Sequence, residues 1–384
     1  MNIFSRADKS VASRWWWEVD RWMLGLIAIL VTTGLWLAFT ASPAVADRLG
    51  LAPNHFAMRQ LVFLLLSLVT VIGVSLMPAS LIRRLCIIGF IPMTLLILLT
   101  LLIGPEYKGA TRWLQFGSFT LQPSEFMKPV FIVVTAWLLS ADFSEEKFPA
   151  KLISSALFGL VVFMLLNQPD VGQTFLIAMV WTGQMALAGL PVMWLAVTGS
   201  VGLAGLAVAY LTLPHVANRI NNFIDPASGD TYQVDKALEA IETGGLFGKG
   251  PGEGTVKLSL PDAHTDYIFA VVGEEFGAIA SLILIAMFAG IVLRGLMHLL
   301  SEDEPFKMLA AAGLLMQFGL QALINIGVNL SLLPSKGMTL PFVSYGGSSM
   351  LALAVGMGMV LALTRKNRHL NPSRNPLAFS SGRL

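Results

Sequence analysis

The sequence predicts an all-α polytopic membrane protein with ten transmembrane helices. Of the 384 residues, 55% are hydrophobic and only 12% are charged, whereas soluble domains carry about 25% charged residues. The mean hydropathy is +0.72. This composition excludes a water-soluble globular protein, a disordered chain and a disulfide scaffold. The net charge of +2 provides no basic field for nucleic acid, so we expect no nucleic-acid partner.

Ten apolar runs account for the predicted spans, because a membrane-spanning helix needs roughly 20 apolar residues. The runs are 22–39, 61–77, 86–104, 126–141, 152–167, 175–189, 192–213, 267–293, 308–333 and 347–364. The first run is longer than the apolar core of a signal peptide, about 7–15 residues, so we expect an uncleaved anchor. The predicted organisation is a leader (1–21), a membrane domain (22–364) and a tail (365–384).

The distribution of basic residues predicts the orientation of these helices. Ten spans place both termini on one side, and that side carries 15 of the 25 Lys and Arg residues. By the positive-inside rule, both termini are then cytoplasmic. The longest polar stretch, about 214–265, becomes a large extracytoplasmic loop between helices 7 and 8. Because the unusual polar segments all fall on this outer face, we expect the function there.

The most informative segment is 260–269 (LPDAHTDYIF), where polar residues directly precede a long apolar run. We expect a helix to begin at 263–265, with Asp266 in its first turn. The helix dipole favours the ionised carboxylate, while burial opposes it. Such a poised carboxylate at the membrane boundary is a candidate general base. The alternative is that Thr265 and Asp266 only cap the helix.

Two further carboxylates, Glu274 and Glu275, lie inside the same apolar run. Charges at membrane depth are costly, and they are usually paired or functional. A buried ion pair that holds helices together and a functional role are both open at this point.

A second segment combines 108–113 (KGATRW) with 122–128 (QPSEFMK). A proline suits the first position of a helix, and Glu125 and Lys128 are three residues apart, so they can pair on that helix. The forked guanidinium of Arg112 matches phosphate oxygens. The alternative is an interfacial Arg-Trp anchor and a single salt bridge.

Three other stretches are polar or rich in glycine. Residues 333–349 include Lys336, a positive charge at the outer face, and glycines and serines that let a backbone approach a ligand or a helix closely. Residues 167–174 predict a tight polar turn. The glycine-rich stretch 244–255 is no phosphate-binding P-loop, because Gly250 stands where Ser or Thr is required. We expect it to form a flexible loop that shapes a cavity.

Taken together, these motifs resemble the SEDS family (shape, elongation, division and sporulation), ten-span bacterial membrane enzymes that polymerise lipid II into peptidoglycan. The resemblance covers about 20–366. The segment 334–341 (PSKGMTLP) is more similar to the division members than to the elongation members, while Asp262 stands where glutamate is usual. The matching segments are 108–113, 122–128, 168–172, 219–226, 232–233, 260–269, 273–275 and 340–349.

The resemblance implies that Asp266 is the catalytic carboxylate. As general base, it would take the proton of the GlcNAc 4-hydroxyl while this oxygen attacks C1 of MurNAc and undecaprenyl pyrophosphate leaves. Arg112, Lys128 and Lys336 are the candidates to stabilise the leaving anion. The other residues expected to bind substrate are Glu125, Gln233, His264, Thr265, Ser344 and Ser348.

The family resemblance also implies partners and a location. The lipid-linked substrate supplies the energy, so no cofactor is expected, although a divalent cation bridging Asp266 and the pyrophosphate stays open. The expected partners are lipid II, a class B penicillin-binding protein that crosslinks the glycan, and other division proteins. The expected location is the bacterial cytoplasmic (inner) membrane at the division septum. A lipid II flippase and a non-catalytic scaffold for the transpeptidase are the alternative functions.

Overall fold

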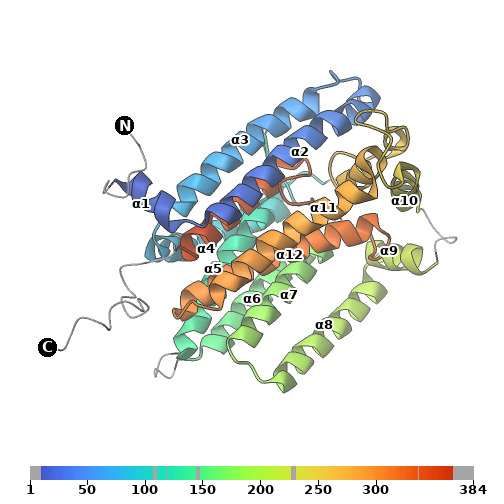
Figure 1. Ribbon diagram of the computed structural model, residues 1–384. Coiled ribbons are helices and arrows are strands. Elements are labelled where there is room, and N and C mark those ends of the chain that lie inside the picture. The colour runs from blue at the N-terminus through green and yellow to red at the C-terminus, as the bar shows by residue number, and fades with distance from the viewer. Residues whose placement is uncertain are drawn as a thin grey trace.

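The computed structural model describes residues 10–106, 110–117, 119–143, 148–225, 231–335 and 337–365. A helix forms at each of the ten predicted apolar runs, and these helices lie side by side as a bundle (Figure 1). They are α2 (Arg21–Arg48), α3 (His55–Ser75), α4 (Ala79–Ile103), α5 (Pro123–Ser140), α6 (Ala150–Asn167), α7 (Val171–Leu187), α8 (Val192–Thr212), α11 (Ile268–Leu299), α12 (Pro305–Asn329) and α13 (Gly347–Leu363).

In the part of the chain that the structure describes, eight helices are long and apolar enough to cross a membrane. The helices α7 and α13 are equally apolar but have 17 residues each. The chain is therefore a mostly helical, multi-pass membrane protein. The bundle centre is formed by α5, α12 and α13, in which most residues are buried. In contrast, α8 stands at the edge, where Ala209 is its one buried residue.

Several short elements were not predicted. A two-stranded antiparallel hairpin pairs Leu114 with Leu121 and Phe116 with Phe119. The hairpin and the other short elements could not be predicted because they are too short or too polar to give an apolar run. They are α1 (Val11–Glu18), β1 (Leu114–Phe116), β2 (Phe119–Leu121), η1 (Ala141–Phe143), α9 (Pro214–Ile224), α10 (Tyr232–Gly244) and η3 (Val256–Ser259).

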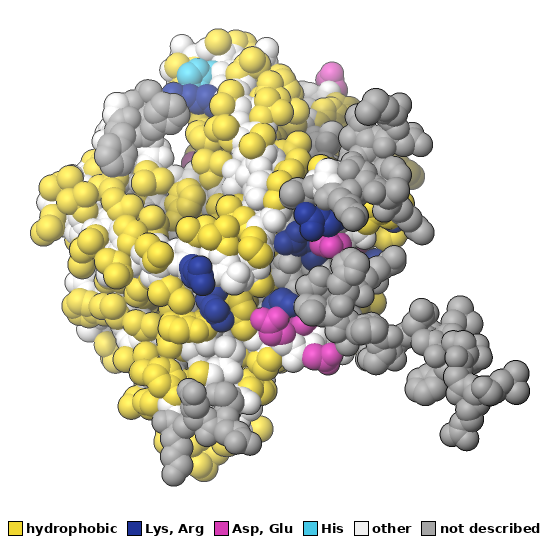
Figure 2. All heavy atoms as spheres, turned by 90° about the vertical axis from the view of Figure 1, so that its left-hand side faces the viewer, with side chains coloured by type: hydrophobic (Ala, Val, Ile, Leu, Met, Phe, Trp, Pro, Cys, Tyr) yellow, Lys and Arg dark blue, Asp and Glu magenta, His cyan; other side chains and the backbone are white. Residues whose placement is uncertain are grey.

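The two ends of the bundle carry different helices and polar segments. At one end lies α1, where Trp15 Nε1 donates to Ser75 Oγ at 2.9 Å and Arg294 Nε lies 2.7 Å from Asp20 Oδ2. Figure 2 shows this side as mostly hydrophobic, with a few Lys, Arg, Asp and Glu side chains, several of which lie next to one another. The opposite end carries α9 and α10 (Figure 1), together with the polar segments that the sequence analysis singled out.

The glycine-rich stretch, expected to be a flexible loop that shapes a cavity, packs tightly against α11 at Gly244 and Gly248. A Cβ added at Gly244 would stand 1.9 Å from the Gly273 carbonyl oxygen, and one at Gly248 would stand 2.2 Å from that of Glu275. At Gly277, φ is 78°, and α11 bends there. Gly244, Gly248 and Gly277 therefore permit close backbone contact between this stretch and α11.

Candidate active site

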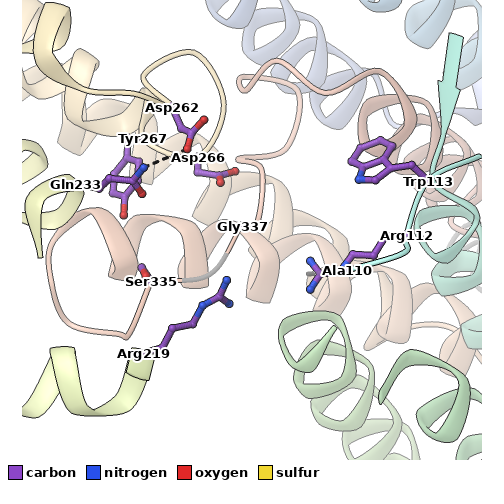
Figure 3. Close-up of a pocket in the computed structure, with 10 residues that line it drawn as sticks. All are labelled: Ala110, Arg112, Trp113, Arg219, Gln233, Asp262, Asp266, Tyr267, Ser335 and Gly337. Carbon is purple, nitrogen blue, oxygen red and sulfur yellow. Dashed lines mark hydrogen bonds between the residues drawn. The ribbon is translucent and has the colours of Figure 1, made fainter. Parts of the chain in front are cut away.

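A cavity of about 210 Å³ lies at the α9–α10 end of the bundle. Figure 3 shows the Arg112 and Arg219 guanidinium groups reaching toward the same space from two sides, with the Asp266 carboxylate across it. Two of the predicted substrate-binding residues, Arg112 and Gln233, and the predicted base therefore meet in one place. The cavity is lined by Ala110, Arg112, Trp113, Arg219, Gln233, Asp262, Asp266, Tyr267, Ser335 and Gly337.

Asp266 lies in a turn before α11 rather than in its first turn, so the expected helix start at 263–265 is wrong. The helix begins at Ile268. The preceding turn is closed by the Asp262 carbonyl oxygen, which accepts from the N–H of Thr265 at 3.1 Å and of Tyr267 at 3.2 Å. Thr265 Oγ1 donates to the same oxygen at 3.2 Å. Thr265 therefore stabilises the turn that presents Asp266 to the cavity.

Arg112 is held by the polar turn between α6 and α7. Its Nε donates to the Gln168 carbonyl oxygen at 3.2 Å and lies 3.5 Å from Asp170 Oδ2. Asp170 also caps α7, because its Oδ1 accepts from the Gln173 N–H at 3.3 Å. Burial raises the pKa of the Asp170 carboxyl, and the Arg112 charge opposes this shift. The predicted polar turn thus orients a cationic side chain of the cavity.

Four polar residues of the cavity wall were not predicted as site residues: Arg219, Asp262, Tyr267 and Ser335. Arg219 belongs to α9, and a lone arginine in an amphipathic segment is the signal that could have identified it. Asp262 Oδ2 accepts from Gln233 Nε2 at 3.3 Å, which joins α10 to the Asp266 turn. Burial raises the pKa of the Tyr267 hydroxyl, so this side chain is neutral at physiological pH.

Glu125 and Lys128 do not line the cavity. Both are buried on α5, with Lys128 Nζ at 2.8 Å from Glu125 Oε2 and 3.3 Å from Gln321 Oε1. Gln173 on α7 donates to the other Glu125 oxygen. The predicted i,i+3 pair is therefore present, and it links α5 to α7 and α12.

The two predicted serines bind backbone N–H groups rather than facing the cavity. Ser344 Oγ accepts from the Leu340 N–H at 2.7 Å, and Ser348 Oγ accepts from the Gln122 N–H at 3.2 Å. Neither serine lines the cavity. Lys336 lies outside the described residues.

His264 sits behind the Asp266 turn in a cluster of three rings. Its imidazole centroid lies 4.5 Å from the ring of Phe56 and 5.3 Å from that of Tyr345, and its carbonyl oxygen accepts from the Tyr345 N–H at 2.9 Å. Burial lowers the pKa of the imidazole to about 4. His264 is thus neutral at physiological pH and supports the turn through packing.

This depressed pKa predicts acid sensitivity. The unfolded chain binds a proton at His264 below about pH 6.5, whereas the folded chain does so only below about pH 4. The contribution of the neutral imidazole to the free energy of unfolding is therefore fully present above about pH 6.5. This free energy falls by about 2 kcal/mol between pH 7 and pH 5. Thermal unfolding of detergent-solubilised protein at the two pH values checks this. His264→Phe keeps the ring packing and should lose clearly less stability on acidification, and an equal loss would contradict the assignment.

Glu274 and Glu275 on α11 bind residues 255–257, a loop segment that precedes the cavity residue Asp262 along the chain. The Glu274 carboxylate accepts from the N–H groups of Thr255 at 2.6 Å, Val256 at 2.7 Å and Lys257 at 2.9 Å, all at the start of η3. Glu275 forms an ion pair with the buried Lys257. The geometry matches the buried ion pair that the sequence analysis left open. Neither glutamate lines the cavity.

The described part of the chain contains no group of three or more His, Cys, Asp or Glu side chains placed to hold a metal ion. Asp262 and Asp266 are the two carboxylates of the cavity. The charged groups that face a ligand there are these two acids and the two arginines. Such a cavity suits a substrate that carries both an anionic group and a hydroxyl.

Comparisons with known proteins identify the class. A family model described as "Cell cycle protein" matches residues 20–369. "Probable peptidoglycan glycosyltransferase FtsW" of Caulobacter vibrioides is 47% identical over 95% of this chain and 94% of its own length. The protein of the same description from Hydrogenovibrio crunogenus is 37% identical over 92% and 93%.

Two solved structures are similar in fold. A chain from "Structural coordination of polymerization and crosslinking by a peptidoglycan synthase complex" aligns with a TM-score of 0.72 and 25% identity, over 90% of this chain and 97% of that one. The rod shape determining protein RodA of Thermus thermophilus aligns with a TM-score of 0.68 and 25% identity, over 91% and 97%. The chain belongs to this cell cycle protein family, the SEDS family that its motifs indicated.

Proposed function

We propose that this chain is a peptidoglycan glycosyltransferase that polymerises lipid II into glycan strands during cell division. The relatives described as FtsW support the reaction and the division role. The observation that carries the proposal is the cavity itself, in which the Asp266 carboxylate faces the guanidinium groups of Arg112 and Arg219. A base and two cations in one cavity are the groups that this reaction requires.

In the proposed reaction, Asp266 accepts the proton of the GlcNAc 4-hydroxyl on the acceptor. The freed oxygen forms a bond to MurNAc C1 of the donor, and the bond from C1 to the pyrophosphate oxygen breaks. One displacement inverts the α-linkage to β. Pyrophosphate is a good leaving group, so no second carboxylate has to act as an acid, in contrast to the carboxylate pair of glycosidases. Arg112 and Arg219 stabilise the charge on the departing pyrophosphate.

The proposed topology follows from the same assignment. The eight long apolar helices, together with α7 and α13, form ten spans, and both termini are cytoplasmic. The loop at about 214–265, which contains α9, α10 and η3, then lies at the outer face with the cavity. The membrane domain (22–364) then lies in the inner membrane at the septum, and the leader (1–21) and the tail (365–384) are cytoplasmic. The structure describes the leader from residue 10 and the tail only at residue 365.

The proposed partner is a class B penicillin-binding protein, which would crosslink the strand as it leaves the outer face, and other division proteins would regulate the pair. The similarity to a chain of a peptidoglycan synthase complex supports this partner. No nucleotide is required. A divalent cation that bridges Asp266 and the pyrophosphate would be a second source of positive charge, and rates measured with magnesium and with EDTA test it.

Purified protein, alone and with its penicillin-binding partner, is supplied with lipid II in detergent or vesicles. Glycan strands are the expected product. Movement of lipid II across the vesicle membrane without polymer would instead support a flippase. Neither product, together with stable binding of the transpeptidase, would support a scaffold.

Removing the Arg219 charge is expected to slow this reaction. Arg219→Gln should lower kcat/KM about 100-fold, because one electrostatic contact to the developing anion is lost, and Arg219→Lys should recover part of the loss. The matched control is Lys236→Gln, which removes a charge from α10 where Lys236 pairs with Glu239 outside the cavity. Steady-state polymerisation rates check the prediction, and equal rates for both glutamine variants would contradict it.

A further inference from the structure

Two buried asparagines lie one turn apart near the end of α12. Asn325 is 2% exposed and Asn329 is fully buried. An amide buried at membrane depth is costly unless its hydrogen bonds are made, and asparagine is a poor helix former. Their presence in a mostly apolar helix therefore requires a specific set of partners.

Both amides donate to the same backbone oxygen, the carbonyl of Asp266. The distance is 2.8 Å from Asn325 Nδ2 and 2.9 Å from Asn329 Nδ2. A carbonyl oxygen accepts two hydrogen bonds, so both of its acceptor positions are used by one neighbouring helix. Because the side chain of Asp266 leaves from the adjoining Cα atom, fixing this carbonyl restricts where the carboxylate can point.

The same two side chains also hold the neighbours of Asp266. Asn329 Oδ1 accepts from the Ala270 N–H at 3.1 Å and so supplies, from α12, a cap for the first turn of α11. Asn325 Nδ2 also donates to the Met338 carbonyl oxygen at 2.6 Å. Met338 follows Gly337, where an added Cβ would stand 3.4 Å from Asp266 Oδ2. Asn325 thus joins the two segments that meet at the carboxylate.

We infer that Asn325 and Asn329 are positioning residues that aim the Asp266 carboxylate at the acceptor hydroxyl. The inference rests on the proposed function, in which Asp266 is the base. A general base acts when it lies within about 2.6–3.2 Å of the hydroxyl oxygen, and a displacement of about 1 Å can lower a rate about 100-fold. The two amides set this placement without touching the substrate.

Asn325→Leu and Asn329→Leu test the inference in the full-length protein with lipid II. We expect kcat to fall about 10- to 100-fold, while KM changes less than about threefold, because geometry and not binding is lost. The acid limb of the kcat–pH profile, which reports the base, should also shift. The matched control is Gln184→Leu on α7, a buried amide that donates to the carbonyl oxygens of Ile132 and Leu309. It should lower the unfolding temperature but keep kcat per folded molecule and the acid limb.

A second variant, Asn325→Asp, keeps the shape of the side chain in case the leucine variants fold poorly. Its protonated carboxyl has one O–H donor and its ionised form has none, so its rate relative to wild type should rise as the pH falls. Asn325→Leu should show no such rise. Wild-type kcat and an unshifted acid limb in folded asparagine variants would overturn the inference. A wild-type protein that makes no glycan would instead refute the proposed function.

Discussion

Asp266→Asn is expected to lower lipid II polymerisation by about 10²–10⁴-fold, the usual contribution of a general base. The amide has almost the same shape as the carboxylate but cannot accept the hydroxyl proton. KM should change little, because Arg112 and Arg219, the residues proposed to bind the pyrophosphate, remain. Glycan strands resolved by electrophoresis from a lipid II reaction provide the measurement.

Two companion variants sharpen this test. Asp266→Glu keeps the base but moves it by about 1 Å, so the rate should fall about 100-fold and not vanish. Asp235→Asn changes an exposed acid on α10 that lies outside the cavity, and its rate should equal that of wild type. If Asp266→Asn polymerised lipid II at the wild-type rate, Asp266 would not be the base.

The second large effect concerns stability rather than rate. Lys257 is buried and bound to Glu275 on α11, and its Nζ also donates to the Thr40 carbonyl oxygen at 3.0 Å. Lys257→Met leaves the Glu275 charge buried without its partner, which costs about 3–5 kcal/mol. We therefore expect a large fall in the unfolding temperature in detergent. The loop before the cavity should become susceptible to proteolysis first, because Lys257 lies within it.

The double variant Lys257→Met/Glu275→Gln distinguishes a broken pair from a general packing defect. With both charges removed, much of the lost stability should return, because no unpaired charge stays buried. Lys236→Met, at the more exposed pair with Glu239, should have little effect. A double variant less stable than Lys257→Met would contradict the ion-pair explanation.

Much of the site could be predicted because its residues are conspicuous in an apolar chain. Asp266 and Arg112 stand out as polar residues beside membrane spans. Both line one cavity together with Gln233, which only the family resemblance indicated. Lys128 is equally conspicuous, yet it is buried in an ion pair with Glu125. Charge and position along the chain do not reveal which way a side chain faces, so only the packing of α5 against α12 separates these two cases.

The supporting groups were not predictable for a different reason. Asn325 and Asn329 lie 59 and 63 residues from Asp266 along the chain. In the sequence, they read as two polar residues inside an apolar run. Their role emerges only when α12 lies beside the start of α11, since a hydrogen bond depends on distance in space and not on separation in sequence.

The sequence by itself determined the membrane class and the ten apolar helices. These features follow from composition and apolar run length, which act locally along the chain. The tertiary structure decided where α11 begins, which cations reach the cavity and what holds Asp266 in place. The start of α11 depends on a cap from Asn329, and the cavity depends on Arg219 from α9 meeting Arg112. Such contacts join distant segments, so they exist only once the bundle has packed.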